Sequence, residues 1–138
     1  MKLCPYLSFD GQCETAFKFY EECLGAKVQV LMPFAGSPMA DECPEEWGPK
    51  IMHGELLLGD RVLMGSDAMP GQYEATQGTS LMIGIDDPDE AEKTFKALAE
   101  GGKVTMPIEE TFWAAKFGAL IDRFGIPWMI NCDKSDNS

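Results

Sequence analysis

His53 is the single histidine of the 138-residue chain, so any imidazole chemistry must use it. Glu55 lies two residues further on, in an apolar stretch with the alternation of a β-strand. On a strand, His53 and Glu55 share one face, while Gly54 and Leu56 share the other, which should pack on a helix. The pair would then point into a curved sheet, where it could ligate a metal or act as acid and base. A hydrogen-bonded strand pair without chemistry is the alternative interpretation.

A second set of polar side chains lies in the first apolar run, residues 3–9. Cys4, Tyr6 and Ser8 alternate there and are predicted to line one sheet face. Tyr6 could donate a hydrogen bond to an oxygen of a ligand, or it could simply anchor the sheet. Cys4 could be a nucleophile only with a base nearby, and His53 is the sole imidazole candidate.

Phe112 and Trp113 are adjacent large aromatic residues ahead of a predicted strand. They could wall a pocket for a planar or apolar ligand. The same pair could instead close the core between two parts of the fold or lie in a dimer contact. The residues alone leave these alternatives open.

The elements that must position these residues come from an internal repeat with an offset of 76 positions. The identities within residues 10–28 are Asp10/Asp86, Glu14/Glu90, Phe19/Phe95, Gly25/Gly101, Lys27/Lys103 and Val28/Val104. Each copy begins with an apolar strand, at residues 3–9 and 79–85. An aspartate suited to cap a helix follows, and then a helix that ends at glycine.

Further strand segments follow each helix. They cover 27–33, 51–58 and 61–65 in the first copy, and 103–106, 115–122 and 126–131 in the second. The sequence therefore predicts an α+β fold of two tandem βαβββ modules, about 1–66 and 79–138, with a linker at 66–78. Residues 34–49 are predicted to form a long, irregular acidic loop.

Composition limits the class of protein. The chain carries 11 Lys and Arg against 23 Asp and Glu, a net charge of −12, which argues against nucleic acid or an anionic membrane as partner. No apolar run approaches the roughly 18 residues of a membrane span, and no secretory signal is recognisable. Five cysteines without a CxxC spacing indicate reduced thiols in a cytoplasmic protein. The length and a hydrophobic fraction of 45% fit one globular domain, residues 1–138.

Three segments, residues 5–28, 51–67 and 110–131, resemble the vicinal oxygen chelate superfamily and, within it, the PhnB-like branch. This superfamily includes glyoxalase I, bleomycin-resistance proteins and extradiol dioxygenases. The resemblance implies that each mixed sheet curls into a cup and that the paired modules form a cleft. It also implies a homodimer, with modules exchanged between chains in some members. By the family's register, Met129 faces the cup and Trp128 the core.

The resemblance also defines where a metal would be held. Metal-dependent members take His or Gln from the first strand of a repeat and Glu from its last strand. The residues of this chain at those positions are Cys4, Tyr6, Ser8, Ser80, Met82, Gly84, Leu63, Met64 and Met129. Apart from Cys4, none is a good ligand for a divalent metal, so we expect no metal site of the family type.

Some members of the branch are labelled ubiquinone-pathway methyltransferases. The glycine-rich strand-to-helix turn that binds an adenosyl cofactor does not occur here, because the glycines fall at helix ends and hairpins. If the chain is an enzyme, we therefore expect glyoxalase- or dioxygenase-like chemistry rather than methyl transfer.

Three functions remain open. The first is metal-independent binding of a small molecule, without a cofactor. Its expected ligand contacts are Tyr6, Ser8, Phe112, Trp113 and Met129. The second is a lyase, isomerase or dioxygenase that uses His53, Glu55 and a divalent metal. The third is a structural or regulatory dimer in which the cups serve the interface.

Overall fold

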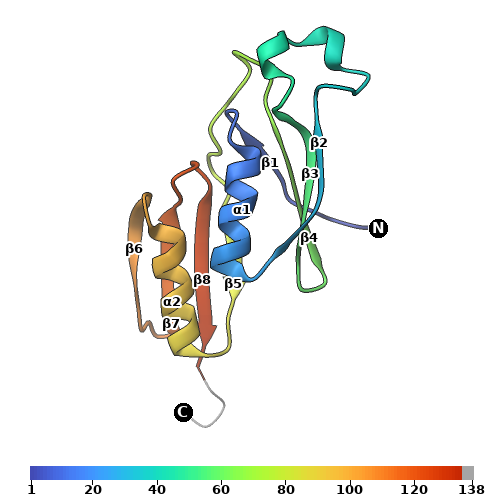
Figure 1. The fold of residues 1–138 in the computed structure, drawn as a ribbon. Helices are drawn as coiled ribbons and strands as arrows, with labels where there is room; N and C mark the ends of the chain where they lie inside the picture. The colour runs from blue at the N-terminus through green and yellow to red at the C-terminus, as the bar shows by residue number, and fades with distance from the viewer. Residues whose placement is uncertain (135–138) are drawn as a thin grey trace. The chain divides into compact units, whose positions relative to one another are not determined.

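The computed structural model describes residues 1–134, which form parts of two compact units. Unit 1 covers residues 1–75, and unit 2 begins at residue 76. Unit 1 contains β1 (Tyr6–Phe9), α1 (Cys13–Leu24), β2 (Lys27–Pro33), β3 (Ile51–Leu58) and β4 (Arg61–Asp67). Unit 2 contains β5 (Leu81–Gly84), α2 (Pro88–Ala99), β6 (Lys103–Glu109), β7 (Ala114–Ile121) and β8 (Pro127–Asp133). This order, βαβββ twice, confirms the predicted α+β fold (Figure 1).

Each unit has one four-stranded mixed sheet. The strand order is β1-β4-β3-β2 in unit 1 and β5-β8-β7-β6 in unit 2. The first strand pairs parallel with the last, and the other pairs are antiparallel. The last strand of each module therefore lies in the centre, between the first strand and the hairpin partner.

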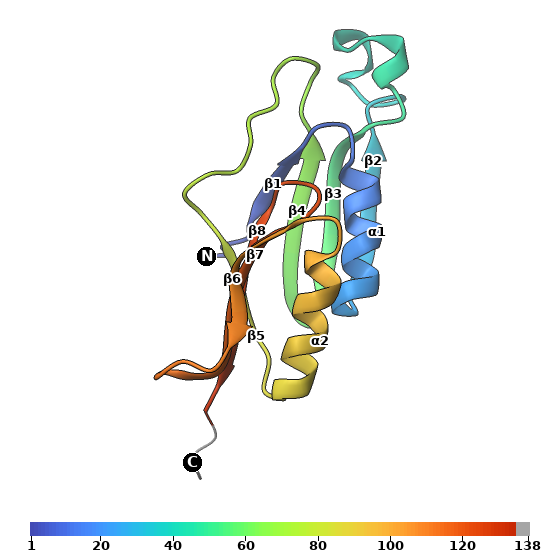
Figure 2. The ribbon, with the colours of Figure 1, turned by 90° about the vertical axis from the view of Figure 1, so that its left-hand side faces the viewer.

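One helix covers one face of each sheet (Figure 2). In α1 the fully buried side chains are Cys13, Ala16, Phe17 and Tyr20, and in α2 the buried ones are Ala91, Thr94, Phe95 and Leu98. A glycine of the sheet lies beneath a phenylalanine in both units. A Cβ atom on Gly54 would come within 2.9 Å of Phe17, and one on Gly118 within 2.7 Å of Phe95.

The two sets of buried helix residues correct the alignment of the repeat. An offset of 78 matches all four buried positions, whereas the offset of 76 pairs Phe19 with Phe95. Phe19 is only half-buried, and Phe17 is the residue that contacts the sheet as Phe95 does. The sequence identities therefore misalign α1 and α2 by two positions, because the equivalent residues of the two helices are those on the buried face.

The helix ends follow the sequence only in part. Gly25 ends α1 in the left-handed conformation, and Asp87 caps α2 by accepting the Asp89 N–H at 3.0 Å. The expectation that Asp10 caps α1 is wrong. The N-cap position is Gln12, which makes no side-chain cap bond, and Asp67 at the end of β4 accepts the Cys13 N–H instead.

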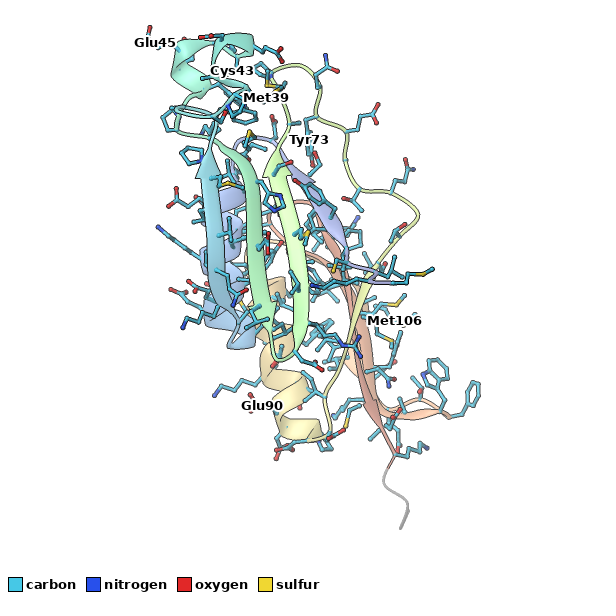
Figure 3. The ribbon with its side chains drawn as sticks, turned by 90° about the vertical axis from the view of Figure 1, so that its right-hand side faces the viewer. Met39, Cys43, Glu45, Tyr73, Glu90 and Met106 are labelled. Atoms are coloured by element: carbon cyan, nitrogen blue, oxygen red, sulfur yellow. The ribbon has the colours of Figure 1, made fainter. Side chains whose placement is uncertain are left out.

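Other differences concern the bounds of the elements. β1 begins at Tyr6, so Cys4 lies outside the strand, whereas β6 extends to Glu109. The loop predicted to be irregular contains two 3₁₀ turns, Ala40–Glu42 and Glu45–Trp47. Figure 3 shows Met39, Cys43 and Glu45 in this loop at one end of unit 1. Within residues 1–134, no helix is long and apolar enough to cross a membrane.

Candidate functional site

The candidate site lies on the face of the unit 1 sheet opposite α1, which we call the polar face. Gly54 and Leu56 are buried toward α1, so the alternation of β3 places His53 and Glu55 on the other side, as predicted. Figure 3 views the sheet from this side, with α1 behind the strands. The residues that alternate onto the polar face include Tyr6, Ser8, His53, Glu55, Met64 and Ser66, with Leu57 and Val62 at its hairpin end.

Strand pairing brings Tyr6 to His53 and Glu55. Tyr6 pairs with Met64, and Met64 pairs with Glu55, so the three residues form one row across β1, β4 and β3. The outer strands of such a row are about 10 Å apart, a gap that long side chains can span. The Tyr6 hydroxyl lies 3.0 Å from His53 Nδ1, and the two rings stack with centroids 5.7 Å apart.

The second bond of the site joins His53 to Glu55. His53 Nε2 lies 2.9 Å from Glu55 Oε2. An ionised carboxylate only accepts hydrogen bonds, so Nε2 donates to Glu55 and Nδ1 of a neutral ring accepts the Tyr6 O–H. The side chains of His53 and Glu55 are 23% and 30% exposed, and Tyr6 is 54% exposed. With the ring neutral, the chain of bonds Tyr6–His53–Glu55 therefore runs in one direction, and it remains accessible to a ligand.

Ser8 lies on the same face as the hydrogen bonds between Tyr6, His53 and Glu55, whereas Cys4 takes no part in them. Ser8 pairs with Ser66 of β4 and shares the polar face with Tyr6. Cys4 precedes β1, and the two ring nitrogens of His53 contact Tyr6 and Glu55. The Cys4–His53 pair that a thiol nucleophile would need is therefore not among the contacts of residues 1–134.

The other expected ligand contacts lie in unit 2. Phe112 and Trp113 occupy the loop between β6 and β7 and are 89% and 48% exposed. Their rings meet edge to face at 4.8 Å, and Trp113 meets Phe117 at 5.4 Å. On β8, Trp128 is buried and Met129 is not, which is the alternation that the resemblance implies.

Two buried carboxylates were not found from the sequence. Asp67 accepts the backbone N–H groups of Cys13 at 2.9 Å and Ile51 at 2.8 Å. Asp122 accepts the N–H groups of Phe124 and Ile126 and the Trp128 indole N–H. An aspartate at the end of a strand was the sole signal, and it is equally typical of an exposed turn.

Burial also changes the acidity of two thiols. Burial, together with the charges of Asp67 and Glu14, raises the pKa of Cys13 from 9.0 to about 12. Burial and neighbouring aspartates likewise raise the pKa of Cys132. Both thiols therefore stay protonated at neutral pH and are unsuited to nucleophilic attack.

A third feature that the sequence did not suggest is a shallow, hydroxyl-rich cavity of about 300 Å³ in unit 2. It is lined by the residues that lead into β5, including Thr76, Thr79 and Ser80, and by Thr105 of β6. Its lining also includes apolar residues of β7 and β8, among them Leu120, Ile121 and Trp128. The lining residues given by the described part of the chain are all uncharged, so the cavity offers neutral polar and apolar contacts.

The residues present do not fit the divalent metal of the metal-dependent relatives. The implied positions on the first and last strands hold Tyr6, Ser8, Met64, Met82 and Met129, which supply hydroxyl and thioether groups instead of imidazole and carboxylate. Among residues 1–134, no group of three or more His, Cys, Asp and Glu side chains is placed to hold a metal ion.

The fold, two βαβββ units with mixed sheets and a helix on one face of each, is that of the vicinal oxygen chelate superfamily. The glyoxylase/bleomycin resistance protein/dioxygenase domain from Frankia sp. EAN1pec has this fold, with a TM-score of 0.68 at 15% identity over 97% of this chain and 98% of that one. The sequence model described as 3-demethylubiquinone-9 3-methyltransferase matches residues 1–131. The chain belongs to this family, the PhnB-like branch of the superfamily.

Two relatives support the assignment, and a third protein shares the fold. Protein YjdN of Escherichia coli (strain K12) is 37% identical over 97% of both chains. The crystal structure of protein PA1353 from Pseudomonas aeruginosa has a TM-score of 0.88 at 45% identity, over 98% of this chain and 99% of that one. A putative 3-demethylubiquinone-9 3-methyltransferase, PhnB protein, from Bacillus cereus has a TM-score of 0.81 at 22% identity, over 96% and 99%.

Proposed function

We propose that the chain binds a small molecule on the polar face of unit 1 without a metal ion. The observation that carries the proposal is the hydrogen-bonded chain Tyr6–His53–Glu55, with distances of 3.0 and 2.9 Å. It holds three polar side chains from two strands in one arrangement, so a ligand would meet a preorganised site. Ser8 is proposed as a further ligand contact on this face, and Phe112, Trp113 and Met129 are proposed as ligand contacts within unit 2.

The donor set of the site supports metal independence. Both nitrogens of His53 already take part in hydrogen bonds, and Glu55 accepts one of them. A metal on His53 and Glu55, as the lyase, isomerase or dioxygenase alternative requires, would have to replace at least one of these bonds. Metal analysis of purified, unchelated protein beside His53→Ala separates the two. Near-stoichiometric metal that disappears in the variant would contradict the proposal.

An adenosyl cofactor, as the family name suggests, does not fit the strand-to-helix connections. Between β1 and α1 there are three residues, Asp10–Gln12, with one glycine, and Ile85–Asp87 between β5 and α2 contain none. Carboxylates of Asp67 and Asp87 already occupy N–H groups at the two helix starts. If the site also performs a reaction, we propose chemistry of the glyoxalase or dioxygenase class rather than methyl transfer.

The test is a fragment screen read by backbone ¹H–¹⁵N chemical shifts. A pool of neutral, cationic and anionic fragments is added to the wild type and to His53→Gln. We expect hits that shift the amides of residues 6–9, 51–58 and 61–67 and that weaken in the variant. Lys18→Gln, on the exposed side of α1, is the control and should leave these hits unchanged. Hits that bind elsewhere, or equally well without His53, would refute the proposal.

A second candidate function is assembly into a homodimer, with or without exchange of modules. The exposure of the Phe112–Trp113 pair favours it, because large aromatic residues at a surface are typical of interfaces. Sedimentation of the wild type and of Trp113→Ala tests this candidate. A dimer lost in the variant, with no ligand found in the screen, would favour a structural or regulatory role. Both candidates treat residues 1–138 as one domain of a cytoplasmic protein.

A further inference from the structure

The direction of the hydrogen-bonded chain determines what the polar face can offer a ligand. Glu55 requires the proton of neutral His53 to lie on Nε2, so Nδ1 is an acceptor and takes the only hydroxyl proton of Tyr6. The Tyr6 oxygen then turns lone pairs, and no proton, toward the ligand. At this site the ligand therefore meets hydrogen-bond acceptors.

The charge around the site is negative, which favours the same kind of ligand as the acceptors do. Glu55 contacts His53 through one oxygen, and within residues 1–75 no Lys or Arg lies within ion-pair distance of it. Lys18 and Arg61, for example, pair with Glu14 and Asp60 instead. Residues 1–75 carry five Lys and Arg against twelve Asp and Glu, a net charge of −7. An anion at this site would meet a like charge without a compensating cation.

The face of the Tyr6 ring is a third feature that favours a cationic ligand. It is more than half exposed and stacks on the His53 ring with an interplanar angle of 28°. The face of such a ring is negative and attracts cations. A lone pair, a carboxylate and an aromatic face thus lie together on one row of strands.

We infer that the ligand of the polar face carries a protonated amino group, which binds at Glu55 beside the Tyr6 and His53 rings. The inference rests on the proposed function, since it names the ligand class of the same site. A primary ammonium group brings a positive charge and three donors to the Glu55 carboxylate, and Tyr6 Oη, on the opposite edge of the His53 ring, can accept from another donor of the ligand. A carboxylate or phosphate group finds no cationic partner at Glu55 among residues 1–75.

Three probes of similar shape test the inference: benzylammonium, benzyl alcohol and benzoate. Their affinities are measured by ¹H–¹⁵N shift titration at one mildly alkaline pH. We expect benzylammonium to bind about tenfold more tightly than benzoate, because Glu55 attracts the ammonium group in one partly exposed ion pair and repels the carboxylate. Glu55→Gln should remove most of this preference. Glu14→Gln, which makes the same change of charge on α1, should retain it.

The outcomes separate the inference from the proposed function. Benzoate that shifts the amides of β1 and β3 as strongly as benzylammonium would overturn the ammonium assignment and leave small-molecule binding intact. A preference that survives in Glu55→Gln would also overturn it, because the attraction would then be that of the net charge. If no probe shifts the amides of β1, β3 and β4, while other fragments do, the ligand class is wrong. If no fragment shifts them, both proposals fail.

Discussion

Removal of the Asp67 carboxylate should destabilise unit 1 more than any other loss of a single charge there. Asp67 is 3% exposed, and it accepts N–H groups from the first residue of α1 and the first residue of β3. It therefore joins three elements: its own strand β4, the start of α1 and the start of β3. Since Gln12 provides no cap, Asp67 also adds a buried negative charge at the start of α1, beside the exposed Glu14 of the first turn.

The magnitude follows from the two bonds. A hydrogen bond to a charged group contributes about 1.5–3 kcal/mol, and a buried donor left without a partner costs a similar amount. Asp67→Ala should therefore lower the free energy of unfolding by about 3–6 kcal/mol. Asp67→Asn keeps one acceptor oxygen and turns an NH₂ group toward the other N–H, so its loss should be about half as large. Such losses are a large part of the 5–15 kcal/mol typical of a domain.

The assay is urea unfolding, followed by circular dichroism, with Asp133→Ala as the matched control. Asp133 ends β8 as Asp67 ends β4, but it is exposed, and within residues 1–134 its carboxylate accepts a bond from the Asn131 side chain and none from the backbone. Its removal should cost no more than about 0.5 kcal/mol. If Asp67→Ala fails to fold, Asp67→Asn and amide exchange at Cys13 and Ile51 give the answer. Equal losses for Asp67→Ala and Asp133→Ala would refute the reasoning.

Two further predictions concern packing and thiols. Gly54→Ala would place a Cβ atom 2.9 Å from the buried Phe17 ring, so it should lower the free energy of unfolding in urea by about 1–3 kcal/mol. As the control, Gly84→Ala meets no atom within 4 Å and should lower it by less than about 1 kcal/mol. Comparable losses would contradict the packing. Because the pKa of Cys13 is raised from 9.0 to about 12, the unfolded chain loses this proton first, and stability should fall by about 1.4 kcal/mol per pH unit between those values. Cys13→Ala should remove that slope. Iodoacetamide should modify Cys13 and Cys132 only after unfolding, because both thiols are buried. Rapid alkylation of either thiol in the native protein would contradict their burial.

The strands and helices were predictable because their signals are local. Alternation marks β3, and Gly25 and Asp87-Pro88 mark helix ends. The cap of α1 was not predictable, because Asp67 lies far along the chain from the helix that it caps. The offset of 76 holds at the starts of β2 and β6, Lys27 and Lys103, but it failed in the helices for a related reason. The identity Phe19/Phe95 aligns two residues of one type, whereas the residues that are buried in each helix are those that face the sheet beneath it.

The candidate site was also predictable in part. The pairing of His53 with Glu55 follows from an i, i+2 spacing on one strand face. The bond from Tyr6 to His53 depends on the parallel pairing of β1 with β4, which no local pattern specifies. The exposure of Phe112 was likewise hidden, since hydrophobicity alone would place such a residue in a core.

The imidazole nitrogens of His53 offer the most direct test of ligand binding at the polar face. Because the chain has one histidine, a long-range ¹H–¹⁵N spectrum of the side chain contains a single ring. The structure predicts a protonated, pyrrole-type Nε2 and a pyridine-type Nδ1 at mildly alkaline pH, and the tightest fragment from the screen should shift both signals. Averaged nitrogen signals that no bound fragment moves would contradict the proposal that Tyr6, His53 and Glu55 form the binding site.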